Sequence, residues 1–165
     1  MVYPLSDGKL NYGDEGLNAC FSVRKRGKNI QYTCKNDKID FLECNKGLEK
    51  YACKINTIID QINNSDGIVF IYTNFISSGV IPLILALEYN GYKKYDSESV
   101  LKYPEYGEGT NTKCEPISYD GHRRSDPRFT DEIFNQGTYA VITGSDDSLN
   151  IDIENDLKNI NDIKN

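Results

Sequence analysis

The sequence has no tryptophan, one methionine, one histidine, and only four alanines and five arginines among its 165 residues. It has no apolar run near the roughly 20 residues that a membrane-spanning helix needs, and its mean hydropathy is −0.57. The first residues do not place a basic stretch before an apolar one, so we expect no secretory signal peptide. Five cysteines are too few and odd in number for a disulfide scaffold. These absences predict a cytoplasmic protein that is not secreted.

Motifs for nucleotide or metal chemistry are also missing. No Gly-rich phosphate loop with a following Lys-Ser or Lys-Thr pair occurs, and Gly107-Glu108-Gly109 lies in a polar stretch rather than after a strand. No Cys-x-x-Cys pair accompanies the single histidine, which argues against a zinc site. A nucleophilic pair of Cys114 and His122, with Asp120 nearby, is as poorly supported as a zinc site, because a charged turn explains the same residues.

The most abundant residues reflect the base composition of the gene, and the charged residues are unevenly distributed along the chain. Ile (18), Asn (17) and Lys (14) are the residues of AT-rich codons. The formal net charge is −6, but residues 1–60 carry 10 basic and 8 acidic side chains, whereas residues 61–165 carry 9 and 17. The acidic excess excludes a wholly basic nucleic-acid clamp and leaves room for a narrow contact.

Residues 1–47 are predicted to form an N-terminal arm and a β-hairpin. Residues 1–18 have the composition of an irregular arm, and residues 19–24 and 29–34 alternate on both sides of a Gly-containing turn. The turn holds the most basic cluster of the chain, which is a candidate for phosphate contacts or else a solvated hairpin tip: Arg24, Lys25, Arg26 and Lys28.

Residues 48–165 alternate between helical and strand patterns. Apolar residues at spacings of three and four predict a helix over 48–63, and a second, almost wholly apolar helix is expected over 80–90, with Pro82 in its first turn and Gly91 as its cap. Residues 68–73 and 138–143 are continuous apolar runs typical of strands covered on both faces. A polar insertion spans about 93–136, and a short helix is expected over 151–163.

This order predicts an α/β fold with a parallel sheet and right-handed crossovers. Ligands of such sheets bind beyond the carboxyl ends of the strands. In this chain that edge holds Thr73, Asn74 and Phe75 after the first strand and Thr143 and Gly144 after the second.

One block of sequence resembles a known family. Residues 67–92 read GIVFIYTNFISSGVIPLILALEYNGY, and a helix with Lys54-Ile55 precedes them. This block resembles the start of the second motor domain in superfamily 2 helicases of large cytoplasmic DNA viruses, of the poxvirus early-transcription-factor type. Residues 14–21 and 139–144 resemble further stretches of that family.

The resemblance implies a partial RecA-like (P-loop NTPase-type) domain that binds the nucleic-acid backbone in an NTP-dependent translocase. It places contacts at Tyr72, Thr73, Asn74, Phe75, Thr143 and Gly144. ATP and magnesium belong to the intact family, whereas this chain lacks the Walker lysine, the acidic motif and the arginine fingers. We therefore expect no cofactor and no turnover by the chain alone.

The expected partners are nucleic acid and either the remainder of the helicase or a transcription complex, in the host cytoplasm or the virion. A fragment, a split gene product or a degenerate copy would each fit, and an incomplete sheet would expose an edge to its missing neighbour. The alternative is a non-catalytic α/β interaction or regulatory module, which the missing Walker motif and the charge of −6 favour. In that case Thr73 and Asn74 form a simple turn and helix cap.

Overall fold

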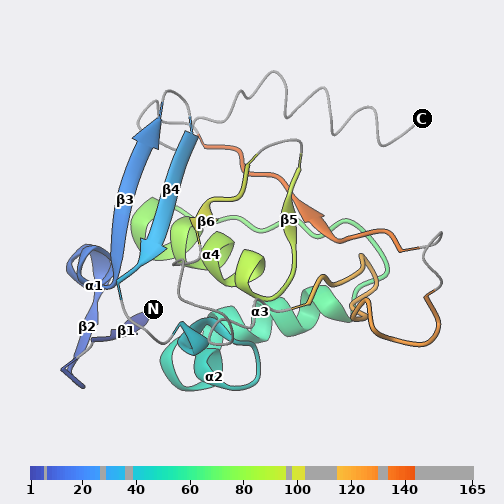
Figure 1. Ribbon diagram of the computed structural model, residues 1–165, viewed down its shortest axis with the longest axis horizontal. Helices are drawn as coiled ribbons and strands as arrows, with labels where there is room; N and C mark the ends of the chain where they lie inside the picture. The colour runs from blue at the N-terminus through green and yellow to red at the C-terminus, as the bar shows by residue number, and fades with distance from the viewer. Residues whose placement is uncertain are drawn as a thin grey trace, which may run out of the picture.

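The computed structural model describes residues 1–5, 7–26, 29–35, 39–95, 98–102, 115–129 and 134–143 (Figure 1). The described part is a mixed α/β fold with short sheets, which confirms the predicted class at that level. No described helix has both the length and the apolar character that crossing a bilayer requires. In chain order the elements are β1 (Val2–Pro4), β2 (Leu10–Tyr12), α1 (Gly13–Cys20), β3 (Phe21–Arg26), β4 (Asn29–Cys34), the 3-10 turn η1 (Asp40–Leu42), α2 (Gly47–Tyr51), α3 (Cys53–Asn63), the π-helical turn η2 (Ile76–Val80), α4 (Ile81–Tyr89), β5 (Lys93–Lys94), β6 (Leu101–Lys102) and β7 (Thr138–Tyr139).

Two strands and a helix occupy most of the described residues before β3, so the predicted irregular arm over residues 1–18 is wrong. β1 and β2 pair as an antiparallel hairpin, and α1 follows directly. Asp14 and Glu15 lie in the first turn of α1, where negative charge favours a helix. α1 passes so close to β1 that a Cβ on Gly16 would lie 2.7 Å from the ring of Tyr3. Gly16 therefore allows α1 to pack closely on β1. The polar composition of residues 13–20 did not indicate this helix.

The predicted β-hairpin is confirmed. β3 and β4 pair antiparallel from Phe21↔Cys34 to Arg26↔Asn29. β4 also pairs in parallel with β6, with Tyr32 opposite Leu101. The result is a three-stranded sheet whose inner side packs on the core, where Phe21 contacts Tyr32 and Phe41 edge-to-face at centroid distances of 6.4 and 6.1 Å.

The predicted helix over 48–63 forms as two helices. α2 ends at Tyr51, Ala52 leaves the helical region with φ −155° and ψ 57°, and α3 begins at Cys53. The apolar positions that predicted the helix still face inward, because Leu48, Ile55 and Ile59 are buried. The spacing of the apolar residues therefore predicted the buried side of both helices, but not the break between them at Ala52.

α4 is the centre of the fold, as its apolar sequence predicts. All nine of its residues are buried, and it contacts α3, β5, β6 and η1. Pro82 lies in the first turn, where no intrahelical N–H is lost. Gly91 adopts φ +101° immediately beyond the helix, a conformation that favours glycine.

The predicted parallel sheet between residues 68–73 and 138–143 is wrong. Residues 68–73 belong to no strand, and five large apolar side chains of this run are exposed. Of residues 138–143, Thr138–Tyr139 alone form a strand, β7, and it pairs in parallel with β5. β5 follows α4 directly and takes the place beside β7 that the sequence pattern assigns to residues 68–73.

The predicted insertion over about 93–136 holds β5, β6 and a set of turns over 115–129, so part of it is built into the core. Val100, Leu101 and Ile117 are all buried. The predicted helix over 151–163 and the residue Gly144 lie outside the described residues.

Candidate functional site

Residues 72–75, which the sequence predicts at the end of a strand, form one largely exposed turn. The hydroxyl of Tyr72 donates a hydrogen bond of 2.6 Å to Oδ1 of Asn74. Oγ1 of Thr73 accepts the N–H of Phe75 at 3.2 Å, which closes the turn into η2. Tyr72 is 88% exposed and Phe75 66% exposed. Both side chains are therefore free to meet a large ligand.

The side chain of Thr143 does not join Tyr72 and Phe75 on the exposed turn. Thr143 is buried at 7% exposure, and Gly144 lies outside the described residues. The two strand ends that were expected to share one edge do not share one, because residues 68–73 are not in the sheet that contains β7.

A second candidate surface lies on the outer side of the β3–β4–β6 sheet, whose strands β3 and β4 are on the left of Figure 1. Directly paired residues of neighbouring strands point to the same side of a sheet. The ladder sets Ser22 beside Thr33, and Thr33 in turn beside Lys102. It likewise sets Arg24 beside Gln31 and Arg26 beside Asn29. We call these seven residues the basic face: Ser22, Arg24, Arg26, Asn29, Gln31, Thr33 and Lys102.

The basic face carries three cations and no carboxylate. Arg24, Arg26 and Lys102 are exposed, in a chain whose net charge is −6. Its other side chains are a hydroxyl or an amide, which bind phosphate oxygens as donors. Lys25 belongs to the opposite side of the hairpin, in register with the buried Ile30, and Lys28 lies outside the described residues. Sequence reasoning missed Lys102, since nothing near it in the chain signals that β6 joins the hairpin.

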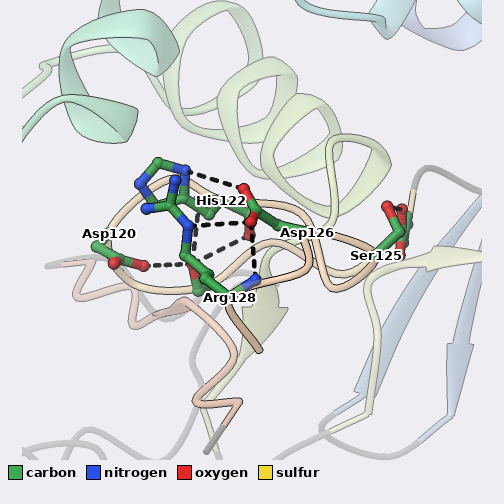
Figure 2. A network of polar contacts seen from close by, with 7 residues as sticks. Asp120, His122, Ser125, Asp126 and Arg128 are labelled. Carbon is green, nitrogen blue, oxygen red and sulfur yellow. Dashed lines mark hydrogen bonds and ion pairs between the residues drawn. The ribbon is translucent and has the colours of Figure 1, made fainter. Parts of the chain in front are cut away.

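A polar network surrounds the single histidine (Figure 2). Ser118 Oγ hydrogen-bonds the Asp120 carboxylate and accepts the main-chain N–H of His122 at 3.0 Å. The imidazole faces Asp126 across 3.9 Å, and Asp126 is held by Nε and the N–H of Arg128 at 3.0 and 3.1 Å. These bonds from Arg128 lower the pKa of Asp126.

The described contacts of this network fix a turn. The hydroxyl of Ser118 contacts the main chain of His122 and the Asp120 carboxylate, and these contacts hold the turn together. Cys114, the nucleophile of the candidate pair with His122, lies outside the described residues. The guanidinium of Arg123 instead joins this turn to the core by donating to the carbonyls of Asn90 and Glu115, at 2.7 and 2.8 Å.

A buried carboxylate joins the elements behind the sheet. Glu88 on α4 is 3% exposed, and its oxygens accept the main-chain N–H groups of Val100 and Leu101 at 2.9 and 2.6 Å. They also accept the hydroxyls of Ser99 and Tyr139 at 2.5 and 2.6 Å. Burial, together with the charge of Glu88, raises the pKa of the Tyr139 phenol. Because four donors hydrogen-bond its oxygens and the residue is buried, we assign Glu88 a role in stabilising the fold.

The described cysteines do not form a site. Cys20 and Cys34 are buried, Cys44 is half-buried and Cys53 is exposed, and none of these four forms a disulfide with another of them. Burial raises the pKa of the Cys44 thiol, which keeps it in the unreactive protonated form. Within the ranges given for the fold, no three His, Cys, Asp or Glu side chains come together in a way that would hold a metal ion.

Comparisons with family models, with curated proteins and with solved structures found no match to this chain.

Proposed function

We propose that this chain is a non-catalytic, nucleic-acid-binding part of a helicase-type motor assembly, of the superfamily 2 kind found in large cytoplasmic DNA viruses. The observation that carries the binding is the basic face, where Arg24, Arg26 and Lys102 lie on one side of a sheet without a carboxylate. The helicase context rests on the likeness of residues 67–92, which include the buried helix α4 and its capping Gly91.

The geometry of the basic face suits an extended phosphate backbone. Arg24 and Arg26 are two residues apart on β3, hence about 7 Å apart along the strand. Lys102 lies two strands away, about 10 Å across the sheet. A backbone that crosses the sheet diagonally can meet all three cations, with Gln31 and Thr33 as donors between them. Such contacts position the nucleic acid and carry no base sequence information.

Nucleotide chemistry is not part of the proposal for this chain. Its residues do not fit an ATP–magnesium site, because the sequence has no phosphate-binding glycine loop and the described acidic groups form no metal-binding cluster. The remainder of the motor, or a transcription complex in the host cytoplasm or the virion, would supply that chemistry.

Single-stranded DNA is expected to bind weakly and through the basic face. Neutralising three phosphates on a single strand predicts that log K falls with log salt with a slope of about −2, at about −0.7 for each phosphate. Replacing Arg24, Arg26 and Lys102 together by Gln should bring the slope close to zero. Fluorescence anisotropy of a labelled oligonucleotide between low and moderate salt measures both quantities.

Two further variants make this test specific. Lys54→Gln removes an exposed cation on α3, away from the basic face, and should leave affinity and slope unchanged. Asn74→Asp adds a negative charge to the exposed turn of residues 72–75. If Asn74→Asp abolishes binding while the triple variant binds as the parent does, the contact lies at the strand-end turn and the basic face is not the site.

The purified chain is expected to show no nucleotide-dependent turnover, with or without single-stranded DNA. A coupled phosphate-release assay measures this. ATP hydrolysis that copurifies with the chain and is lost when a residue of this chain is substituted would contradict the non-catalytic assignment.

A further inference from the structure

Residues 68–72, the exposed segment, have the side-chain pattern of a β-strand without a partner. Ile68, Phe70 and Tyr72 are 68, 88 and 88% exposed, whereas Val69 and Ile71 between them are each 41% exposed. Exposure that alternates with a period of two is the pattern of an extended chain with one face resting on the molecule. Figure 1 shows this stretch as the light-green coil between α3 and α4.

The main chain of the exposed segment has unused hydrogen-bonding groups. Over the described part of the chain, no hydrogen bond involves an N–H or carbonyl of residues 67–72. A row of unpaired main-chain groups in extended conformation is a template for pairing with another strand. Most natural edges carry a charge or a proline that prevents this, yet residues 67–81 contain neither.

We propose that the exposed segment is a self-association site, at which residues 68–72 of two copies pair antiparallel about a two-fold axis at Phe70. The composition of the segment selects a second copy as the occupant. In this register Phe70 lies opposite Phe70, and Ile68 opposite Tyr72. These are the aromatic–aromatic and aromatic–β-branched pairs that stabilise antiparallel strands.

The inner face and the flanks of the segment also suit this register. Val69 lies opposite Ile71, which continues the apolar contact on the side that faces each molecule. Asp66 lies opposite the neutral Asn74, so the two-fold axis brings no like charges together at the ends of the segment. A nucleic-acid backbone is the poorer occupant, because the segment offers it no cation.

The two proposals differ in their response to salt. Each copy carries a net charge of −6, so salt screens the repulsion between two copies and should strengthen the dimer. Binding of DNA to the basic face should weaken over the same salt range. Failure of one proposal therefore leaves the other standing.

Sedimentation equilibrium of the full chain, over a range of concentrations and at two salt concentrations, tests the pairing. We expect a monomer–dimer equilibrium that shifts toward dimer in higher salt. Phe70→Lys places two ammonium groups opposite each other and should raise the dimer dissociation constant about tenfold or more. Tyr119→Lys alters a side chain that is 64% exposed at a different place and serves as the matched control.

Mixing two variants tests the two-fold axis itself. Phe70→Lys and Phe70→Glu should each dimerise more weakly than the parent when alone, yet should pair with each other because position 70 faces position 70. Far-UV circular dichroism confirms that each variant keeps the fold. The proposal is overturned if the parent stays monomeric in high salt, if Phe70→Lys dimerises as the parent does, if the mixture fails to pair, or if assembly continues beyond two copies.

Discussion

Replacing Glu88 by Ala is expected to lower the free energy of unfolding by about 3 to 5 kcal/mol, which is a large part of the stability of a domain this size. The substitution leaves the N–H groups of Val100 and Leu101 buried without an acceptor. Each unsatisfied donor costs about 1 to 3 kcal/mol, and the lost bond from Tyr139 adds to this. Urea unfolding followed by circular dichroism measures the change.

Two variants separate the buried acceptor from a general effect of removing charge. Glu49→Ala on the surface of α2 removes an exposed carboxylate and should change stability by less than about 0.5 kcal/mol. Glu88→Gln keeps one acceptor oxygen and should fall between the parent and Glu88→Ala. A cost below about 1 kcal/mol for Glu88→Ala would mean that β6 and β7 are not held through this carboxylate.

Replacing Gly91 by Ala is expected to destabilise the fold by about 2 to 5 kcal/mol. The φ of +101° costs an L residue about 1 to 2 kcal/mol. In addition, the new Cβ would lie 2.3 Å from the carbonyl oxygen of Glu115, and such overpacking typically costs about 1 to 3 kcal/mol. Thermal or urea unfolding of the variant measures the sum.

Gly8 provides the matched control for this substitution. Its φ is +81°, and a Cβ there would have no neighbour within 4 Å. Gly8→Ala should therefore show the conformational cost alone, about 1 to 2 kcal/mol. Equal costs at the two positions would contradict the close approach of Glu115 to the end of α4.

The sequence predicted the helix and the hairpin that depend on interactions between residues close together in the chain. The β3–β4 hairpin follows from alternation around a glycine turn, and α4 follows from a nearly uniform apolar run with Pro82 at its start and Gly91 at its end. These signals depend on residues a few positions apart. They do not depend on what the rest of the chain places beside them.

The errors arise where the neighbours decide the outcome. Residues 68–73 have the composition of a buried strand, but an apolar run does not reveal whether a pairing strand is present. In the described structure β5 occupies the place beside β7, and the run is left exposed. α1 was missed for the opposite reason, since Gly16 weakens the helical pattern while allowing the contact with Tyr3.

The candidate site was predictable in part. Arg24 and Arg26 stand out in the sequence as part of a basic cluster. The register of the hairpin is needed to show that they lie on one side of the sheet and Lys25 on the other. Lys102 joins them only because Thr33 pairs with it across the sheet. Pairing between distant segments leaves no signal in the local sequence. The sequence therefore predicted the basic residues of the hairpin, but not the surface that they form with Lys102.

The parallel pairing of β4 with β6 also sets the order in which the chain becomes structured. β4 ends at Cys34, yet its second neighbour begins only at Leu101. During synthesis, the β3–β4 hairpin therefore exists for a long stretch of elongation as a two-stranded ribbon, which is marginal in water. Pairing of β6 with β4 closes a long loop, from Cys34 to Leu101, and the entropy cost of closing it precedes the stabilising contacts. We expect β6 docking, which also brings Val100 and Leu101 to Glu88, to limit the folding rate.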